Sequence, residues 1–181
     1  MFHSSMRNRL IVSFVTLIVL TLSSLGSYVL WYFHNNNVER LSSNLQAEAE
    51  ITEQFLRPYM KDPLAQANID NTLKELATKV ALRLTIIDTT GTVIADSWEN
   101  PVLMESHLNR PEVASALSGE VGRATRFSNT LGENAMYLAI PMRYGQEITG
   151  VLRASTTLVH VEAGYNEIRR VLLIALLLTC L

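Results

Sequence analysis

Three arginines and a tyrosine in the second half of the chain carry the groups best suited to holding an anion: Arg110, Arg126, Tyr137 and Arg153. Guanidinium and hydroxyl donors form strong hydrogen bonds with carboxylate and phosphate groups, which makes these four residues the candidate ligand contacts. Each also has a structural interpretation. Arg126 and Arg153 fall at alternating strand positions that would face water. Arg110 would decorate a helix start, and Tyr137 would belong to the core.

Other reactive side chains are scattered along the chain. The four histidines are His3, His34, His107 and His160, and no two of them stand at the i, i+4 spacing of a helical metal site. The sequence contains no Gly-x-Ser-x-Gly turn that would present a serine nucleophile, and no Gly-rich phosphate loop. We therefore predict no catalytic residue, no metal site and no cofactor in these 181 residues.

The N-terminal region predicts a membrane anchor. Residues 10–33 form a 24-residue stretch without a charge, with two arginines just before it and aromatic residues crowding its far end. That length spans a bilayer, and the basic side is expected inside the cell. The pattern therefore predicts a cytoplasmic segment over 1–9, a transmembrane helix over 10–33 and an extracytoplasmic domain over 34–170. A cleaved signal peptide is the alternative.

The last eleven residues, 171–181, are apolar throughout. They are too few to span a bilayer and match the first half of a second, truncated transmembrane helix. The alternative is a short buried C-terminal helix, although such a helix would have no polar face to turn toward water.

The predicted domain over 34–170 is mildly acidic, with 13 Lys and Arg against 17 Asp and Glu. Nucleic-acid binding needs clustered basic side chains, so this balance argues against a nucleic-acid partner. The single cysteine, Cys180, lies in the terminal apolar segment, and no disulfide can therefore stabilise the domain.

Hydrophobic spacing predicts two helices followed by a strand-rich region. The first helix leaves the membrane and places one apolar face at Val38, Leu41, Leu45, Ala49, Thr52 and Leu56. A second helix is expected over 69–80, with Thr72 and Glu75 at capping-box spacing near its start.

After residue 80 the period changes to that of strands. A hairpin is predicted from two strands, over 84–88 and 92–96. A short helix with proline in its first turn is predicted over 110–118. Three more strands are predicted over 122–127, 135–142 and 148–155, separated by turns over 129–132 and 144–146. Strands joined by short turns are mostly antiparallel, so we expect an α+β domain.

A final apolar stripe steps by three and four residues from the last strand into the C-terminal apolar segment: Leu158, Val161, Tyr165, Ile168 and Leu172. This spacing is typical of a coiled coil, which would make the segment a signalling helix that packs in a homodimer. The alternative is packing against the first helix of the same chain.

Several stretches of the predicted domain are similar to a known family. The runs RLTIIDTTGTVIADS over 83–97 and NRPEVASALSG over 109–119 resemble the extracytoplasmic sensor domain of bacterial sensor histidine kinases, of the phosphate-regulon and cell-wall types. Shorter matching stretches are TRFSNTLG over 125–132, MYLAIP over 136–141 and ITGVLR over 148–153. The similarity covers residues 34–170 and, with two flanking spans, the whole layout.

This resemblance implies a Cache-like (PAS-like) domain with a long N-terminal helix, a five-stranded antiparallel sheet and a helix that enters the membrane. Domains of this family often hold small anions or amino acids between sheet and helices. A kinase part would follow inside the cell, where ATP, Mg²⁺ and a response regulator would bind. The stimulus would be a small molecule or contact with a membrane or cell-wall protein.

Other classes of protein would also suit this layout. A chemoreceptor or a membrane-bound cyclic-dinucleotide enzyme would carry the same kind of sensor domain. A surface-anchored binding scaffold would carry it without any output domain.

Overall fold

The computed structural model describes residues 6–58, 68–128 and 132–180. Parts of three predicted segments lie outside the described residues: positions 1–5 of the cytoplasmic segment, positions 129–131 of a turn, and position 181 of the second span. Chain contacts divide the protein into two compact units, one made by the segments before Arg40 and after Leu158, and the other by Arg40–Leu158.

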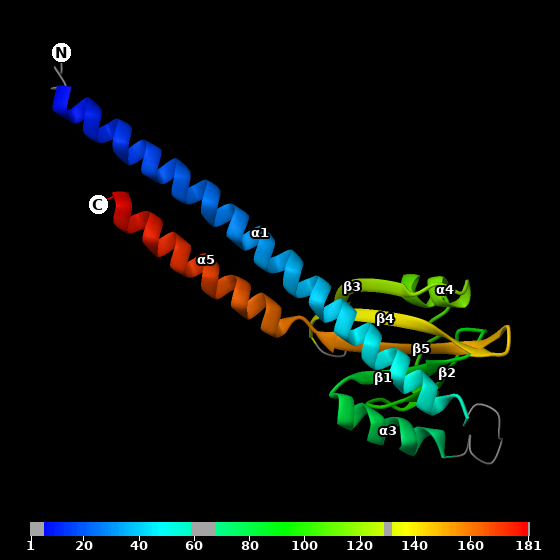
Figure 1. Ribbon diagram of the computed structural model, residues 1–181. Coiled ribbons are helices and arrows are strands. Elements are labelled where there is room, and N and C mark those ends of the chain that lie inside the picture. The colour runs from blue at the N-terminus through cyan, green and yellow to red at the C-terminus, as the bar shows by residue number, and fades with distance from the viewer. Residues whose placement is uncertain (1–5, 59–67, 129–131, 181) are drawn as a thin grey trace. The chain divides into compact units, whose positions relative to one another are not determined.

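The first unit is a pair of antiparallel helices that lie side by side (Figure 1), formed by the first part of α1 (Met6–Leu56) and by α5 (Val159–Cys180). Their close approach is set by glycines. A Cβ atom at Gly26 would lie 3.3 Å from the Leu172 side chain, and one at Gly164 would lie 3.1 Å from Phe33. Up to Phe33, the buried and half-buried residues of α1 recur at steps of three and four: Val15, Val19, Leu22, Gly26, Leu30 and Phe33.

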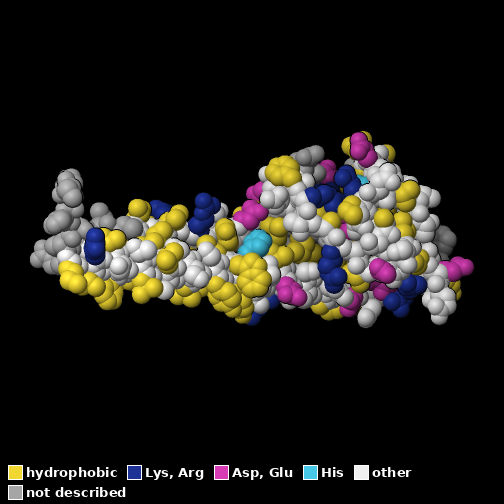
Figure 2. Space-filling view, turned by 90° about the horizontal axis from the view of Figure 1, so that it is seen from above, with side chains coloured by type: hydrophobic (Ala, Val, Ile, Leu, Met, Phe, Trp, Pro, Cys, Tyr) yellow, Lys and Arg dark blue, Asp and Glu magenta, His cyan; other side chains and the backbone are white. Residues whose placement is uncertain are grey.

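Much of the outer surface of this helix pair is hydrophobic, with a few basic side chains among the apolar ones (Figure 2). Leu17, Leu20 and Leu25 of α1 are each about 60% exposed, at 58%, 62% and 61%. Within the described residues, α1 is the one helix long and apolar enough to cross a bilayer, with a mean hydropathy of 2.1 in its best window. Exposed leucines of this kind are suited to lipid.

Four residues of the predicted C-terminal stripe share the half-buried face of α5: Val161, Tyr165, Ile168 and Leu172. Their role as a signalling helix stays a prediction. Leu158, the first residue of the stripe, directly precedes α5. Its N–H donates to the Asn134 carbonyl at 2.9 Å and its side chain is 6% exposed, because the chain is still held beside β4 at this residue.

The second unit is built on a five-stranded sheet in which all neighbours are antiparallel, as predicted. The strands are β1 (Arg83–Ile87), β2 (Val93–Asp96), β3 (Gly122–Ser128), β4 (Glu133–Tyr144) and β5 (Glu147–Thr157), in the spatial order β2-β1-β5-β4-β3. The longest strands, β4 and β5, therefore occupy inner positions. Gly91 supplies the positive φ of 85° that the β1–β2 turn requires.

The two faces of the sheet are covered by different helices. On one face α4 (Pro111–Leu117) buries Val113 and Ala116 against Ile87 and Val151 of the sheet. On the other face the sheet meets α1, where Arg123 of β3 donates hydrogen bonds to Ser42 and Gln46. The helix α3 (Ile69–Val80) packs beside β1 and β2, and a short 3-10 helix, η1 (Pro101–Leu103), follows β2. The apolar face predicted for α1 is confirmed at its buried positions: Leu45, Ala49, Thr52 and Leu56.

The predicted capping box of α3 is wrong. Asn68 occupies the N-cap position, and its side chain makes no capping hydrogen bond. Thr72 lies one turn inside the helix, where its hydroxyl donates back to the Asn68 carbonyl at 3.2 Å. A hydroxyl that bonds the preceding turn of its own helix is not available to cap the helix start.

Candidate functional site

The strand register places several polar residues on the α4 face of the sheet. Side chains at alternate strand positions share a face, and directly paired residues point to the same side. Arg153 of β5 pairs with Thr85 of β1, and Thr85 pairs with Asp96 of β2. Arg126 of β3 lies two residues beyond Ala124, the partner of Tyr137. Residues far apart in sequence therefore meet above the middle of the sheet.

These side chains enclose a cavity of about 170 Å³ on the α4 side of the sheet. The four residues predicted as ligand contacts all line it: Arg110, Arg126, Tyr137 and Arg153. The remaining lining residues are Arg83, Met104, His107, Phe127 and Ser128. The structure thus brings the predicted residues to one place, while their role in binding a ligand stays a prediction.

Arg126 is held on two sides. Its Nη1 and Nη2 atoms donate to the two carboxylate oxygens of Glu112 at 2.8 and 2.9 Å, and its guanidinium lies 3.8 Å from the centroid of the Tyr137 ring. The alternative interpretation, in which Arg126 simply faces water, does not describe this position, because a buried carboxylate on α4 draws the guanidinium inward and leaves the side chain 27% exposed. Two of its five N–H donors are used by Glu112, and its position is fixed by this pairing, so Arg126 shapes the wall of the cavity.

Arg153 is buried to a degree that the sequence did not predict. Its side chain is 4% exposed, against the expectation that it would face water. The Nη2 atom donates to the Thr85 hydroxyl at 3.1 Å, whereas the Nε atom has no hydrogen-bond partner among the described residues. Burial, with the nearby positive charges of Arg83 and Arg126, lowers the pKa of Arg153 to about 10, although Glu112 and Asp96 oppose the shift. The group remains a cation at neutral pH.

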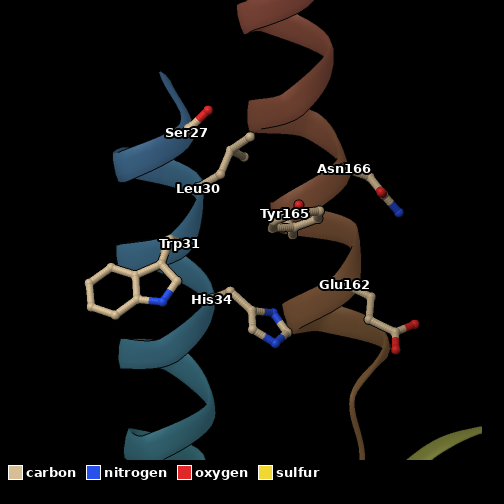
Figure 3. Close-up of a pocket in the computed structure, with 7 residues that line it drawn as sticks. All are labelled: Ser27, Leu30, Trp31, His34, Glu162, Tyr165 and Asn166. Carbon is tan, nitrogen blue, oxygen red and sulfur yellow. The ribbon is translucent and has the colours of Figure 1, made fainter. Parts of the chain in front are cut away.

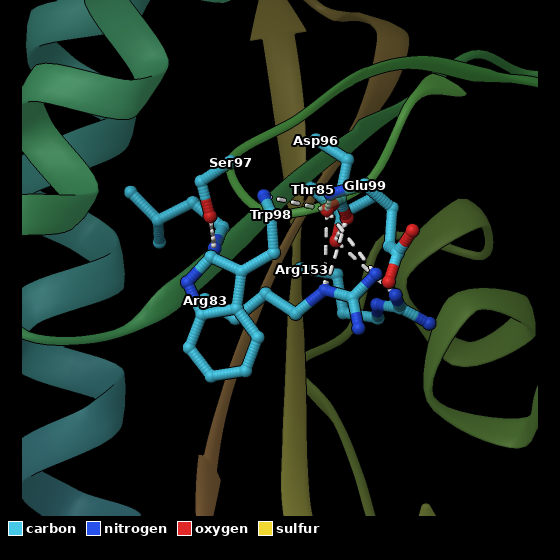
Figure 4. A network of polar contacts seen from close by, with 8 residues as sticks. Arg83, Thr85, Asp96, Ser97, Trp98, Glu99 and Arg153 are labelled. Carbon is cyan, nitrogen blue, oxygen red and sulfur yellow. Dashed lines mark hydrogen bonds and ion pairs between the residues drawn. The ribbon is translucent and has the colours of Figure 1, made fainter. Parts of the chain in front are cut away.

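A polar network behind the cavity holds the ends of β1 and β2 together (Figure 4). Asp96 is fully buried and accepts hydrogen bonds from Arg83 Nε at 3.2 Å, from the Thr85 hydroxyl at 2.7 Å and from the N–H groups of Trp98 and Glu99 at 2.9 and 2.8 Å. Burial acts to raise the pKa of Asp96, but these hydrogen bonds together outweigh it and hold the pKa below its ordinary value. Asp96 is therefore an anion whose carboxylate oxygens already have hydrogen-bond partners.

His107 and Arg110 close the cavity from the segment between η1 and α4. The His107 ring is 7% exposed, and its Nδ1 atom lies 2.7 Å from the Glu105 carbonyl oxygen. Arg110 is the N-cap residue of α4 and makes no capping hydrogen bond with its side chain. Arg110 therefore lines the cavity without being engaged in capping α4, and its guanidinium is one of the donors that a ligand in the cavity would meet.

The lining carries an excess of positive charge. Among the described residues that line the cavity, four are arginines and none is Asp or Glu. The two carboxylates beside it, Glu112 and Asp96, are 0% exposed and already paired with Arg126 and Arg83. Fixed donors without free acceptors form a site for an anion.

Sequence reasoning missed Arg83, His107, Asp96 and Glu112. Arg83 directly precedes the predicted hairpin, and the period-2 rule would have placed it on the face of Thr85. Asp96 could not be placed in this way, because the register of β1 and β2 shifts between Ile86 and Ile87. Nothing local marks Glu112 as a partner of Arg126, since the two are joined across α4 and β3 by tertiary packing.

A second cleft, of about 630 Å³, lies within the helix pair of the first unit (Figure 3). Its lining residues from α1 are Ser27, Leu30, Trp31 and His34, and those from α5 are Glu162, Tyr165 and Asn166. The His34 and Tyr165 rings meet edge to face with centroids 5.8 Å apart. Tyr165 of the predicted stripe therefore contacts α1 of the same chain.

The long N-terminal helix and the antiparallel sheet in the order β2-β1-β5-β4-β3 form a fold that this chain shares with solved sensor domains. The solved structures that share the fold include sensor domains of a histidine kinase and of a chemoreceptor.

Three of these structures show the extent of the similarity. The sensor domain of the V. cholerae histidine kinase DctB is 20% identical with a TM-score of 0.63, covering 81% of this chain and 59% of that one. The sensory domain of the Campylobacter jejuni chemoreceptor Tlp3, with isoleucine bound, is 13% identical with a TM-score of 0.59, covering 83% and 64%. The E. coli DcuS sensor domain is 13% identical with a TM-score of 0.53, covering 74% and 98%.

The chain spans about three fifths of the length of the DctB and Tlp3 domains, with coverages of 59% and 64%. No family model matches the sequence, and no curated protein matches it. At these identities the comparisons establish the fold.

Proposed function

We propose that this chain is the signal-sensing input module of a bacterial membrane receptor, and specifically of a sensor histidine kinase. The fold shared with sensor domains of two histidine kinases and a chemoreceptor supports this function. The apolar segment of α1 supports a membrane anchor. In this proposal the sheet unit lies outside the cell, the receptor is a homodimer, and a cytoplasmic kinase part uses ATP and Mg²⁺ to phosphorylate a response regulator. A chemoreceptor is the second candidate, because Tlp3 shares the fold.

The observation that carries the proposed ligand is the excess of positive charge around the cavity, where four arginines line the wall and two buried carboxylates, Glu112 and Asp96, lie beside them. Arg110 and Arg153 are the two arginines that we expect to contact the ligand. We infer that the module senses a small anion that lacks an ammonium group. An α-amino acid brings an ammonium as well as a carboxylate, and an ammonium needs an acceptor of negative charge. No acidic side chain lines the cavity among the described residues. Tlp3 was solved with isoleucine and with L-valine, so the proposed specificity differs from what that receptor binds.

In this proposal the signal passes from the cavity to the C-terminal helix along β5. Arg153 lies on this strand, and a single residue, Leu158, separates the strand end at Thr157 from the start of α5 at Val159. Small displacements of about 1–2 Å between packed helices are sufficient to switch known receptors. The ligand must bind two arrangements of the protein with different affinity, otherwise it transmits nothing.

The test is anion binding by the full chain in lipid nanodiscs, followed by calorimetry and thermal unfolding. Acetate, succinate and inorganic phosphate serve as probe anions, with valine as the ammonium-bearing comparison. We expect at least one anion to bind and to raise the unfolding temperature by mass action, and valine to bind more weakly. Loss of a charge-assisted hydrogen bond costs about 1.5–3 kcal/mol, so Arg153→Gln and Arg110→Gln should each weaken binding roughly 10- to 100-fold.

Arg40→Gln is the matched control, because Arg40 is an exposed arginine of α1 that does not line the cavity. Equal binding by Arg40→Gln, Arg110→Gln and the wild type would contradict the site, and preference for valine over every anion would contradict the ligand class.

A further inference from the structure

Glu112 connects the lining of the cavity to a helix. It is the second residue of α4 and is 0% exposed. Both of its carboxylate oxygens accept from Arg126, at 2.8 and 2.9 Å, and Oε1 lies 3.9 Å from Arg153 Nη1. One buried carboxylate on α4 thus serves two guanidinium groups that line the cavity, one from β3 and one from β5.

The backbone around Glu112 is held close to the sheet. A Cβ atom at Gly122, the first residue of β3, would lie 1.9 Å from the Glu112 carbonyl oxygen. The helix has seven residues and contributes two side chains, Val113 and Ala116, to the apolar cluster on this face. Removing one partner of a buried ion pair is strongly destabilising, so the pair of Glu112 with Arg126 acts together with this packing to hold α4 in place.

We propose that Glu112 is the positioning residue through which an anion in the cavity acts on α4. An anion beside Arg153 competes with the Glu112 carboxylate for the same positive charge and places a second negative charge near it. The pairing between α4 and the sheet is then weakened, and α4 moves away from β3. The proposal rests on the proposed function in one respect, since it requires that an anion occupies the cavity.

Thermodynamic linkage predicts that Glu112 also affects the affinity for the anion, which can be measured. If the anion weakens the pairing of Glu112 with the arginines of the sheet, then Glu112 must weaken the binding of the anion by the same factor. Removing the negative charge while keeping the shape of the side chain should therefore strengthen anion binding. Charges a few ångströms apart in a partly buried site interact strongly enough to change affinity by about 10-fold.

The experiment compares Glu112→Gln with Glu120→Gln in the full chain in nanodiscs, with succinate as the probe anion. Glu120 is exposed just beyond α4, so this control removes the same charge without touching the arginine cluster. We expect succinate to bind the Glu112→Gln protein about 10-fold more tightly than the wild type, and the control to bind like the wild type. Hydrogen exchange of residues 111–119 should become faster when succinate is added to the wild type, and should respond little in Glu112→Gln.

Each outcome decides between the two proposals. If succinate, acetate and phosphate all fail to bind the wild type, the anion site itself is refuted. If an anion binds through Arg153 but the Glu112→Gln protein binds it no more tightly, the role of Glu112 is refuted and the sensing function stands. Should Glu112→Gln fail to fold, hydrogen exchange on the wild type alone decides, because protection of 111–119 that is unchanged or increased by the anion contradicts a weakened α4.

Discussion

Arg153 shows what the cavity is built to do at the level of a single side chain. A buried donor without a partner costs about 1–3 kcal/mol, and the Nε atom of Arg153 is such a donor among the described residues. The protein retains this cation although burial and two neighbouring arginines lower its pKa to about 10. A ligand carboxylate or phosphate would satisfy the donor and the charge at once. Anion binding at the Nε atom would therefore recover the free energy that this one unpaired donor costs.

His107 makes the stability of the sheet unit depend on pH. Burial, with the positive charge of Arg153 and Arg110, lowers the pKa of His107 below its ordinary value, although the Glu105 carbonyl and Glu112 act the other way. The unfolded chain keeps the higher pKa, so it binds more protons than the folded chain as the pH falls through about 6.5, and folding becomes weaker. We expect the unfolding temperature to drop between pH 7.5 and pH 5.5, and the drop to be smaller in His107→Gln.

His160→Gln is the control, because His160 is an exposed histidine. This variant should show the same drop in unfolding temperature as the wild type. An equal drop in the wild type and in both variants would rule out His107 as the source of the pH dependence.

The elements were largely predictable because their apolar residues repeat with the period of the local structure. The helix over 69–80 and the five strands were found within two residues at each end, since alternation and turn residues mark them. The predicted set of ligand contacts also falls in one cavity. What could not be read is pairing across the chain: the Glu112–Arg126 ion pair draws an arginine inward, and the hydrogen bond from Leu158 to Asn134 delays the start of α5.

Gly122 tests how tightly α4 must lie on β3. A Cβ atom there would lie 1.9 Å from the Glu112 carbonyl oxygen, and backbone cannot yield as a flexible side chain does. We expect Gly122→Ala to lower the free energy of unfolding by about 2–3 kcal/mol, as overpacking of a close contact does. Gly145→Ala is the control, since open space surrounds that position and its positive φ of 61° alone should cost about 1 kcal/mol. Chemical denaturation of both proteins measures the difference, and equal losses would show that the α4 contact tolerates a methyl group.

At the scale of the whole molecule, the proposed receptor depends on where each part of the chain lies. The apolar segment of α1 and the exposed leucines of the helix pair suit a bilayer, whereas charged side chains gather on the sheet unit (Figure 2). The sequence predicts which side is outside from two arginines before the span, and this orientation is open to direct test.

Cysteine labelling tests the orientation in intact cells. Cys180 is first replaced by serine, and a single cysteine is then introduced at Thr89, an exposed position of the β1–β2 turn, or at Asn8 near the start of α1. A membrane-impermeant maleimide should label Thr89→Cys in intact cells and Asn8→Cys only after lysis. The reverse pattern would place the sheet unit in the cytoplasm and overturn the proposed receptor.

The contact between Gly26 and Leu172 has a mechanical consequence. A leucine seated over a glycine fills a notch, because the neighbouring positions of α1 all carry bulkier or polar side chains. Sliding or rolling α5 along α1 would lift Leu172 out of this notch before it could settle in another. We therefore expect α5 to move along α1 between discrete positions and not continuously. A graded stimulus would then be transmitted as a change from one position to another.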